Sequence, residues 1–575
     1  MIKEFLTQRL KRGLVRRLNN LKIASAAREV ARREPQPDGA PVVFFKASSG
    51  IDDLSWNSGF HLLASWALRL KGVPVAYFAC NSGMSKCVLG TNRDDPHQAM
   101  PCRSCVYQSR TLYTEVQRFK STDGQRLTLS GLEGTGVKWF EYERDEKLER
   151  ALENLNVEEL SKFEHVVARN VVTKQSPLNE GVVSGQSTPL ATTLPLGPLC
   201  LPGLRWVLRI HHLNDDENTR YLLREYILSA WNVARKFSDF LDQVQPRAVV
   251  VFNGQFFPEA TARWIAQKRG IRVITHEVGL QPASAYFTEG EATAYPIHIP
   301  DDFELNDEQN ARLDAYLARR FQGDFTMAGI KFWVDMKGLD VSFLRKAAGF
   351  KQIVPVFTNV IFDTSQPHAN TVFEDMFQWL DLVLDTIRSH RDTLFVVRAH
   401  PDELRLRKSS RETVQGWVAG RGVDKEPNVV FVSPHETLSS YELIQKSKFV
   451  MIYNSTIGLE ASIMGAAVLC AGRARFTQYP TVFFPQTVNA YQKELEDFLN
   501  TEKIEVPADF QRNGRRFLYY QLFRTSLPFG DFLEPSVRTT QTRLRSFTLD
   551  ELLESDAVKA ILDGILNGGD FLLPG

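Results

Sequence analysis

The stretch of residues 448–472 restricts the fold more than any other part of this chain. It reads as a strand, a tight turn at residues 454–456, a short helix and a second strand. Residues 449–453 and 466–470 are continuously apolar, which is typical of strands covered on both faces of a parallel sheet. The last two turn residues begin the helix, where free N–H groups and the helix dipole attract an anion. The stretch therefore predicts a parallel α/β domain with an anion site, although Ser and Thr also cap helices that bind nothing.

Buried strands that end in polar residues alternate with helices in both halves of the chain. This alternation is typical of doubly wound sheets, in which ligands bind at the carboxyl edge. A chain of 575 residues is also longer than one hydrophobic core usually serves. We therefore expect an α/β fold of two doubly wound parallel-sheet domains with a cleft between them. The clearest further strands are those at residues 42–46, 248–254, 271–280, 352–357, 393–398 and 428–434.

The same patterns predict the boundaries of the domains. A basic N-terminal helix with its linker precedes the first Rossmann-like domain, and a helical crossing segment leads to the second. The expected ranges are 1–40 for the helix and linker, 41–300 for the first domain with an insertion near 80–245, 301–344 for the crossing segment, 345–503 for the second domain and 504–575 for a C-terminal helical segment.

The N-terminal segment is strongly basic. Residues 1–34 contain ten Lys or Arg and three Glu. This pattern predicts a basic amphipathic helix that can lie on an anionic membrane surface. A helix packed on the body of this protein, or of a partner, explains the same pattern, so both interpretations stay open. An apolar residue recurs at every fourth position, namely Ile2, Leu6, Leu10, Leu14 and Leu18.

Four of the six cysteines are grouped in the sequence, and the last two of the four are separated by two residues. Four soft ligands can close a tetrahedral zinc site that holds an irregular loop together. Buried free thiols near the end of a strand are the alternative, because the spacing is not that of a standard zinc finger. The candidate ligands of a structural zinc are Cys80, Cys87, Cys102 and Cys105.

The composition argues against several classes of protein. The net charge of +1 gives no overall field for binding nucleic acid, and six cysteines are too few for a secreted disulfide scaffold of this length. No apolar run approaches the roughly 20 residues of a membrane-spanning helix, and the N-terminus lacks an apolar signal region. We therefore expect a cytoplasmic protein without a nucleic-acid partner, peripheral at the inner face of the membrane if the N-terminal helix binds lipid.

Three strand ends of the second domain carry polar residues that would meet at one edge of the sheet. A cation, an imidazole and hydroxyl groups would converge there. This combination suits a phosphate or diphosphate leaving group, whose developing charge needs preorganised donors. Each residue also has a structural explanation, such as a helix cap, a surface ion pair or a turn. The candidates are Thr358, Asn359, Arg398, His400, Asn454, Ser455 and Thr456.

Two segments of the second domain resemble a known family. RAHPDE at residues 398–403 and the segment 439–472 are similar to the nucleotide-binding half of bacterial capsule polysaccharide biosynthesis glycosyltransferases. The resemblance implies the GT-B fold, with two Rossmann-like domains facing a cleft. It also implies a His-Pro pair and a Ser/Thr motif like those that hold the nucleotide phosphate in CMP-sialic acid and CMP-Kdo transferases. Residues 252–254 and 276–279 resemble the family's first domain more weakly, while the cysteine-rich segment and residues 173–203 depart from it and leave the acceptor open.

The resemblance further implies roles for single residues. His400 would contact the donor phosphate, and Ser455 and Thr456 would bind it. Glu460 would bind hydroxyls of the donor ribose or sugar, and catalysis would need no metal or other cofactor. The general base should be a carboxylate that faces the cleft and deprotonates the acceptor hydroxyl. The candidates are Glu277, whose motif matches, and Asp52 and Asp53, which are also typical of turns and helix caps.

The sequence thus predicts a metal-independent, nucleotide-sugar-dependent glycosyltransferase. A CMP-linked donor is favoured, and the acceptor would be a hydroxyl of a growing surface polysaccharide or glycolipid. A GT-B sugar-nucleotide epimerase or a polyol-phosphate transferase could use the same phosphate pocket. A non-catalytic scaffold of a polysaccharide assembly complex is the alternative from another class.

Overall fold

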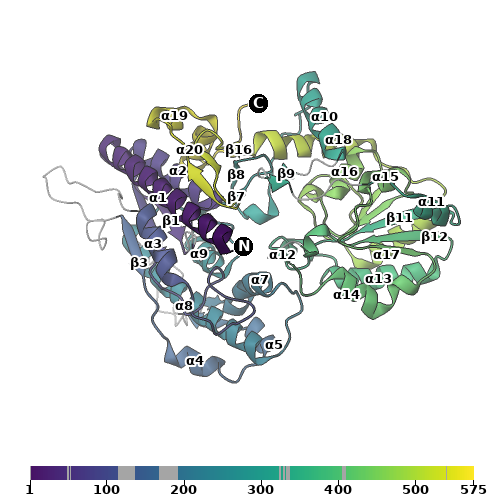
Figure 1. Ribbon diagram of the computed structural model, residues 1–575, viewed down its shortest axis with the longest axis horizontal. Helices are drawn as coiled ribbons and strands as arrows, with labels where there is room; N and C mark the ends of the chain where they lie inside the picture. Colours follow the sequence, from purple (N-terminus) through teal and green to yellow (C-terminus); the bar gives the residue numbers. More distant parts are fainter. Residues whose placement is uncertain are drawn as a thin grey trace, which may run out of the picture. The chain divides into compact units, whose positions relative to one another are not determined.

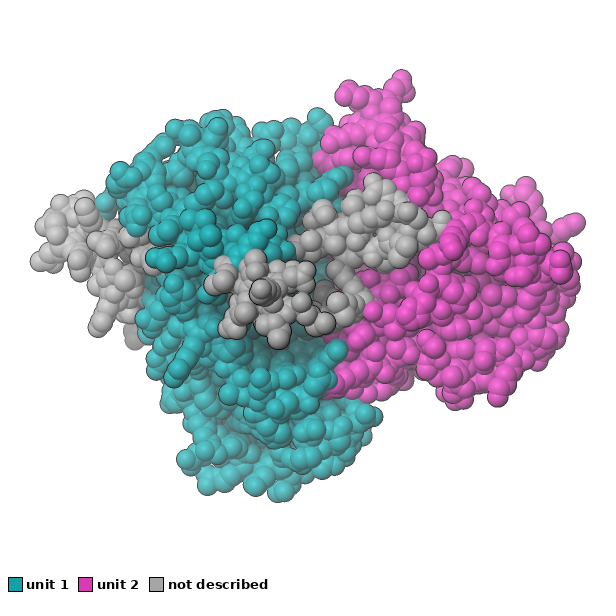
Figure 2. Space-filling view, in the orientation of Figure 1, with its two compact units in different colours: residues 1–207, 213–293, 524–575 teal, residues 208–212, 294–523 magenta. Residues whose placement is uncertain are grey.

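The computed structural model describes residues 2–47, 51, 53–113, 136–167, 192–322, 326–327, 330–331, 337–404, 409–538 and 540–575. Asp52, one of the predicted bases, lies outside these residues. The chain forms two compact units, shown in teal and magenta in Figure 2. Unit 1 contains residues 1–207, 213–293 and 524–575, and unit 2 contains residues 208–212 and 294–523.

Unit 1 is built on a seven-stranded sheet with the order β16-β8-β7-β6-β1-β2-β3 (Figure 1). The pairs from β7 to β3 are parallel, whereas β8 pairs antiparallel with both β7 and β16. The strands are β1 Val42–Lys46, β2 Val75–Cys80, β3 Val137–Phe140, β6 Ala248–Phe252, β7 Arg272–Val278, β8 Ser284–Glu289 and β16 Leu527–Pro528.

Helices and short hairpins complete unit 1. β4 pairs antiparallel with β5, and β17 with β18. The remaining elements of this unit are α1 Ile2–Arg33, α2 Trp56–Leu70, α3 Cys102–Leu112, α4 Glu146–Leu152, α5 Val157–Ser161, β4 His165–Val167, β5 Thr192–Leu194, α7 Leu196–Leu208, α8 Glu217–Val244, α9 Phe257–Lys268, η1 Ala292–Ala294, β17 Leu533–Pro535, β18 Thr542–Leu544, α19 Leu549–Glu554 and α20 Asp556–Asn567.

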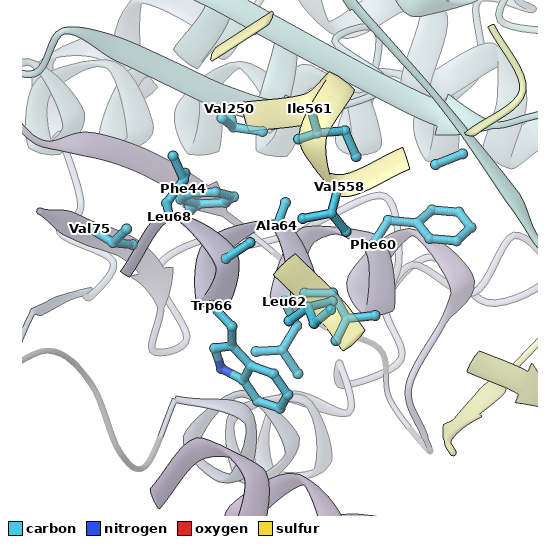
Figure 3. Close-up of a cluster of buried hydrophobic side chains, with 14 of the residues drawn as sticks. Phe44, Phe60, Leu62, Ala64, Trp66, Leu68, Val75, Val250, Val558 and Ile561 are labelled. Atoms are coloured by element: carbon cyan, nitrogen blue, oxygen red, sulfur yellow. The ribbon is translucent and has the colours of Figure 1, made fainter. Parts of the chain in front are cut away.

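The sheet of unit 1 is covered on both faces. Phe44 of β1 belongs to a core cluster with residues of α2 and α20, among them Ile561 (Figure 3). The next residue, Phe45, packs on the opposite face, where its ring centroid lies 5.2 Å from that of Phe237 on α8. Successive strand residues point to opposite faces, which explains why all five residues of β1 are buried. This two-sided burial is the arrangement that the apolar runs predict.

Unit 2 contains a five-stranded sheet with the order β13-β12-β11-β14-β15, and every pair in it is parallel. The carboxyl ends of β11, β12 and β14 therefore lie at one edge of this sheet. The strands are β11 Gln352–Phe357, β12 Thr393–Arg398, β13 Val429–Val432, β14 Val450–Ile452 and β15 Val468–Cys470.

The other elements of unit 2 are mostly helices that connect these strands. A small antiparallel pair, β9 with β10, lies in the segment expected to be a helical crossing. These elements are α10 Asp307–Phe321, β9 Thr326–Met327, β10 Ile330–Lys331, α11 Val341–Ala347, α12 Gln366–Ala369, α13 Met376–Ser389, η2 Pro401–Leu404, α14 Val414–Arg421, η3 Val423–Lys425, α15 Ser440–Gln445, α16 Ile457–Ile463, η4 Arg475–Gln478, α17 Val488–Asn500, α18 Ala508–Tyr519 and the π-helix η5 Tyr520–Arg524.

The chain is divided differently from the expected boundaries at both ends. Residues 504–575 do not form a separate helical segment, because residues 524–575 belong to unit 1 and β16 extends its sheet at β8. The N-terminal helix also belongs to unit 1, where Ile23, Ala27 and Val30 of α1 are buried in the core. The expected α/β fold class is confirmed, since each unit contains a Rossmann-like sheet whose strands are mostly or entirely parallel.

Within the described residues, no helix combines the length and the hydropathy that a membrane span requires.

Candidate functional site

A cavity that opens to solvent, with about 510 Å³ of empty space in and at its mouth, lies at the carboxyl edge of the unit 2 sheet. Six of the eight residues predicted to bind the donor line it, which brings the ends of β11, β12 and β14 together. Three further polar or charged side chains at the cavity or beside it were not predicted: Arg320 of α10, Ser440 of α15 and Tyr441. The six predicted residues are Thr358, Arg398, His400, Ser455, Thr456 and Glu460.

Arg398 is the buried cation of this cavity. It ends β12 and is only 5% exposed, and its Nη1 donates a hydrogen bond to the carbonyl oxygen of Leu438. No carboxylate within the described ranges forms an ion pair with it. Burial lowers the pKa of Arg398 to about 10, although Glu436 acts in the opposite direction. A buried charge without a partner is costly, so this arrangement favours an anionic ligand.

His400 lies two residues further along the same strand end and is half-buried. Its Nδ1 accepts a hydrogen bond from the backbone N–H of Asp402 at 3.1 Å. Burial lowers the pKa of His400, and Arg398 acts in the same direction, while Asp402 and Asp363 oppose the shift. The ring is therefore neutral near pH 7 and carries its proton on Nε2, from which it can donate to a phosphate oxygen.

Ser455 and Thr456 line the cavity, and the helix behind them is short, as the sequence predicts. α16 has only seven residues and begins at Ile457, with Thr456 as an N-cap whose side chain makes no capping bond. A helix this short adds little dipole charge. The two residues therefore contribute mainly their hydroxyl and backbone donors.

Glu460 is held by two neighbours that the sequence did not identify. Its Oε1 accepts from Arg320 Nε at 2.9 Å, and its Oε2 accepts from the hydroxyl of Tyr441 at 2.5 Å. Arg320 and Tyr441 come from α10 and α15, 140 and 19 residues away from Glu460 in the chain. This network fixes the carboxylate at the cavity wall, where it can still accept hydrogen bonds from hydroxyl groups.

The other predicted donor-site residues hold the strand ends in place. The hydroxyl of Thr358 donates to the carbonyl oxygen of Arg398 at 2.9 Å. The backbone N–H of Asn454 donates to Asn359 Oδ1 at 3.2 Å, which ties the end of β14 to the end of β11. Asn359 and Asn454 do not line the cavity, and it is the side chain of Asn359 that positions it from behind.

The predicted bases belong to unit 1. Glu277 lies near the end of β7, is half-buried, and accepts from Asn253 Nδ2 at 2.6 Å and from the backbone N–H of Val278 at 3.1 Å. Asp53 is buried and accepts from the backbone N–H of Leu54 at 2.8 Å. It also accepts from Asn19 and Ser536. Asp53 therefore ties distant segments together, which is a structural arrangement.

A buried polar cluster at the carboxyl ends of β1 and β7 was not predicted. Lys46 Nζ donates to Ser58 Oγ at 3.3 Å, and burial lowers the pKa of Lys46 to about 8, against the influence of Glu259 and Cys105. Burial likewise raises the pKa of Glu259 to about 7, while Lys46 opposes it. His276 Nε2 lies 3.3 Å from His61 Nδ1, and burial lowers the pKa of both histidines. Each of these residues lies within a largely apolar segment of the sequence. No polar motif therefore indicates the cluster.

The four grouped cysteines all line one cavity of unit 1, of about 400 Å³. None of these four forms a disulfide, and burial raises the pKa of Cys80 to about 12 and that of Cys87 still further.

Among the described residues, one group of side chains is close enough together to ligate a metal, and it lies in unit 2, where His211, His212 and Asp375 meet. The ring nitrogens of His212 lie 3.0 Å from Asp375 Oδ2 and 2.5 Å from Glu412 Oε1. Hydrogen bonds to Asp375 and Glu412 raise the pKa of His212 to about 10, so both nitrogens carry protons near neutral pH. His212 is therefore an ion-pairing residue and offers no lone pair to a metal.

Comparisons with known proteins place the cavity of unit 2 within a known family region. Residues 335–497 match the family model described as capsule polysaccharide biosynthesis protein. The chain is also similar to Protein FixF of Sinorhizobium fredii, with 24% identity over 307 residues. That match covers 52% of this chain and 65% of the relative, so the chain spans a little under two thirds of that protein.

Several solved structures match part of the chain, among them two transferases and an epimerase. Two are described as Thermosulfurimonas dismutans KpsC, a beta Kdo 2,4 transferase and a beta Kdo 2,7 transferase. Their identities are 10% and 13%, with TM-scores of 0.32 and 0.30, and they cover 54% and 55% of this chain and 87% and 86% of their own. A UDP-GlcNAc 2-epimerase from Neisseria meningitidis is 14% identical, with a TM-score of 0.24, over 51% of this chain and 80% of its own. The resemblance predicted from the sequence is confirmed by the match of residues 335–497 to the model of the capsule polysaccharide biosynthesis protein family.

Proposed function

We propose that this protein is a nucleotide-sugar-dependent glycosyltransferase that binds the phosphate of its donor in the cavity of unit 2. One observation carries the proposal: Arg398 is a buried guanidinium in that cavity, and no carboxylate in the described part of the chain pairs with it. A phosphate would supply the missing charge and could accept two hydrogen bonds from the planar guanidinium.

The neighbouring groups suit the departure of a nucleotide. When the bond between sugar and phosphate breaks, negative charge grows on the phosphate oxygens, and fixed donors stabilise that charge. Arg398 supplies a cation, His400 supplies Nε2–H, and Ser455 supplies a hydroxyl at the same cavity wall. These protein donors lead us to propose that transfer proceeds without an added divalent metal. Glu460, held by Arg320 and Tyr441, would accept hydrogen bonds from hydroxyls of the donor.

The reaction would join the donor sugar to a hydroxyl of a growing surface polysaccharide or glycolipid. Glu277 is our candidate for the base that removes the proton of this hydroxyl. The family match over residues 335–497 supports a role in capsule polysaccharide synthesis. The His-Pro pair at residues 400–401 and the Ser-Thr pair at residues 455–456 favour a CMP-linked donor.

A thermal-shift panel of CMP, CDP, UDP and GDP tests the proposal, because a ligand that binds only the folded state raises its melting temperature. We expect a cytidine nucleotide to give the largest shift. His400→Ala should weaken binding of that nucleotide by about 10- to 150-fold, the effect of losing one hydrogen bond to a charged group. It should leave the melting temperature of the free protein nearly unchanged.

The exposed histidine His298 provides the control, since His298→Ala should bind the nucleotide as the wild type does. If no nucleotide shifts the wild type, the scaffold role is favoured and the proposed function is wrong. If the protein interconverts a UDP-sugar without an acceptor, it is an epimerase. If His400→Ala binds normally, His400 does not contact the phosphate.

We also propose that α1 attaches the protein to an anionic lipid surface. One side of this helix packs into unit 1, but Leu14, Leu18 and Leu21 on the other side are 60%, 53% and 59% exposed. The basic residues Arg17 and Lys22 are exposed beside them. An exposed apolar stripe flanked by cations is the pattern of helices that lie in a membrane interface.

Vesicle flotation should show binding to vesicles that contain phosphatidylglycerol and weak binding to phosphatidylcholine alone. Changing Leu14, Leu18 and Leu21 to Ser should weaken binding at least about 100-fold, because each buried leucine contributes roughly 1.5–3 kcal/mol. Val341→Ser removes an apolar side chain of unit 2 that is 72% exposed, more than any of the three leucines, and should have no effect. Equal flotation of the triple variant and the wild type would contradict this role of α1.

A further inference from the structure

Helix α1 belongs to an outer layer of unit 1 that covers α2. Almost every residue of α2 is buried, because strands of the sheet, α1, α20 and β18 all pack against it. α1 also packs against α3, and Gln108 Nε2 of α3 donates to Asn20 Oδ1 of α1 at 3.4 Å (Figure 1). Ile23 of α1 and Leu112 of α3 are buried in the same core cluster as Phe44. The two helices therefore lie side by side, with their inner sides turned toward one core.

The outer side of α3 carries an aromatic residue between two cations. Arg103, Tyr107 and Arg110 are spaced four and three residues apart, which places them on one side of the helix. All three are exposed, and the exposed fraction of Tyr107 is 61%. The helix contains no acidic residue, so nothing on α3 itself neutralises the two arginines. The exposed side of α3 is thus basic and partly apolar, like that of α1.

The exposed sides of the two helices point in the same direction. Each helix has its exposed side opposite the residues that reach the shared core, and this core lies on one side of both helices. The exposed leucines of α1 and the exposed residues of α3 therefore form one surface, which we call the α1–α3 face. It consists of Leu14, Leu18, Leu21, Arg103, Tyr107 and Arg110.

The C-terminal end of α1 has a different character. Arg33, in the last turn of α1, forms an ion pair with Asp550 of α19. Glu551 and Glu554 on the same short helix are also exposed. Carboxylates repel an anionic surface. The part of this layer that suits an anionic partner is therefore the α1–α3 face, away from α19.

We propose that α3 joins α1 in binding anionic lipid, so that the whole α1–α3 face lies on the lipid surface with Tyr107 as its aromatic anchor. Arg103 and Arg110 attract anionic headgroups, and a tyrosine ring suits the boundary between headgroups and hydrocarbon. A single helix would leave the attached body free to turn about the helix axis, whereas two helices side by side fix which side of unit 1 meets the lipid. That side is the Phe44 side of the sheet, and α8 covers the other. This inference rests on the proposed attachment through α1 and is independent of transfer activity.

Flotation of the full-length protein with vesicles that contain phosphatidylglycerol tests the role of α3. Arg103→Ser with Arg110→Ser should weaken binding about 30-fold and make it less sensitive to ionic strength. Tyr107→Ser should weaken binding about 10-fold at low and at high ionic strength, because it removes apolar contact and no charge. Lys147→Ser with Arg150→Ser is the matched control, since it removes the same charge from exposed positions of α4, which packs on α8. This control should bind as the wild type does.

Thermal unfolding shows whether each variant is folded, because the guanidinium of Arg110 also lies 5.4 Å from the centroid of the Trp139 ring. Tyr107→Ser keeps the test valid if the double arginine variant is unstable. If the wild type floats and both α3 variants float equally well, α3 does not meet the lipid and this inference is wrong, while the attachment through α1 stands. Equal weakening in the α4 control would show an effect of net charge alone and would also overturn it. If the wild type does not float, the attachment through α1 fails together with this inference.

Discussion

Arg398→Met should strongly weaken nucleotide binding while leaving the free protein at least as stable as the wild type. Methionine keeps a long apolar side chain in place of the arginine stem but removes the charge. Burial lowers the pKa of Arg398 to about 10, which shows that the folded protein without ligand bears a cost for this cation. We expect only a bound phosphate to offset this cost of burying the guanidinium. Truncating one partner of a buried charge pair costs about 2–5 kcal/mol, so the nucleotide should bind about 30- to 5,000-fold more weakly.

Calorimetric titration and thermal unfolding of the same variants measure both effects. Arg398→Lys should bind with intermediate affinity, because lysine keeps the charge but cannot form the two parallel hydrogen bonds of a guanidinium. Arg388 provides the matched control: it is a surface arginine of unit 2 paired with Glu426 at 2.9 Å, and Arg388→Met should bind the nucleotide normally. Wild-type affinity in Arg398→Met would refute the phosphate role. A large loss of stability would instead show that Arg398 supports the fold.

The parallel sheets could be predicted from the sequence because their strands are buried on both faces. Residues 449–453 are all apolar, and all five are buried. The polar residues that follow such runs could be placed at one edge for the same reason, since parallel strands share their direction. Arg398 and His400 were found in this way, and both line the cavity of unit 2.

The parts that could not be predicted depend on contacts between distant segments. Arg320 meets Glu460 across 140 residues, and nothing in the sequence near either residue indicates this pair. β16 has two residues, too few to show any periodicity, yet it joins the C-terminal segment to the sheet of unit 1. The burial of Lys46 and Glu259 was not predicted. A single charged residue beside an apolar run does not show from the local sequence whether its side chain is buried.

The structure also changes which hydrogen-bond donor we expect to contribute most to phosphate binding. The sequence placed the anion at the start of the helix after β14, whereas α16 has seven residues and Thr456 forms no side-chain cap. The buried guanidinium of Arg398 is now the stronger feature. Its role could be judged only after its exposure and its partners were known, which are tertiary properties.

Glu277→Gln should reduce the rate of transfer by about 100- to 10,000-fold, the range that general bases typically contribute. The amide keeps the size of the side chain and its Oε1 can still accept from Asn253 Nδ2, so the local hydrogen bond survives. It cannot take a proton from the acceptor hydroxyl. The kcat should therefore fall while the KM for the donor stays nearly constant, as steady-state kinetics with the donor identified by the nucleotide panel would show.

Asp53→Asn tests whether Asp53 acts as the catalytic base or only stabilises the fold. The buried oxygens of Asp53 accept from Leu54, Asn19 and Ser536, which lie far apart in the sequence. Its substitution should lower the melting temperature and leave the kcat within a few-fold of the wild type at a temperature where both are folded. If Asp53→Asn loses turnover and Glu277→Gln does not, the base belongs to the segment after β1. If Glu277→Gln raises only the KM for the donor, Glu277 binds the donor and does not move the proton.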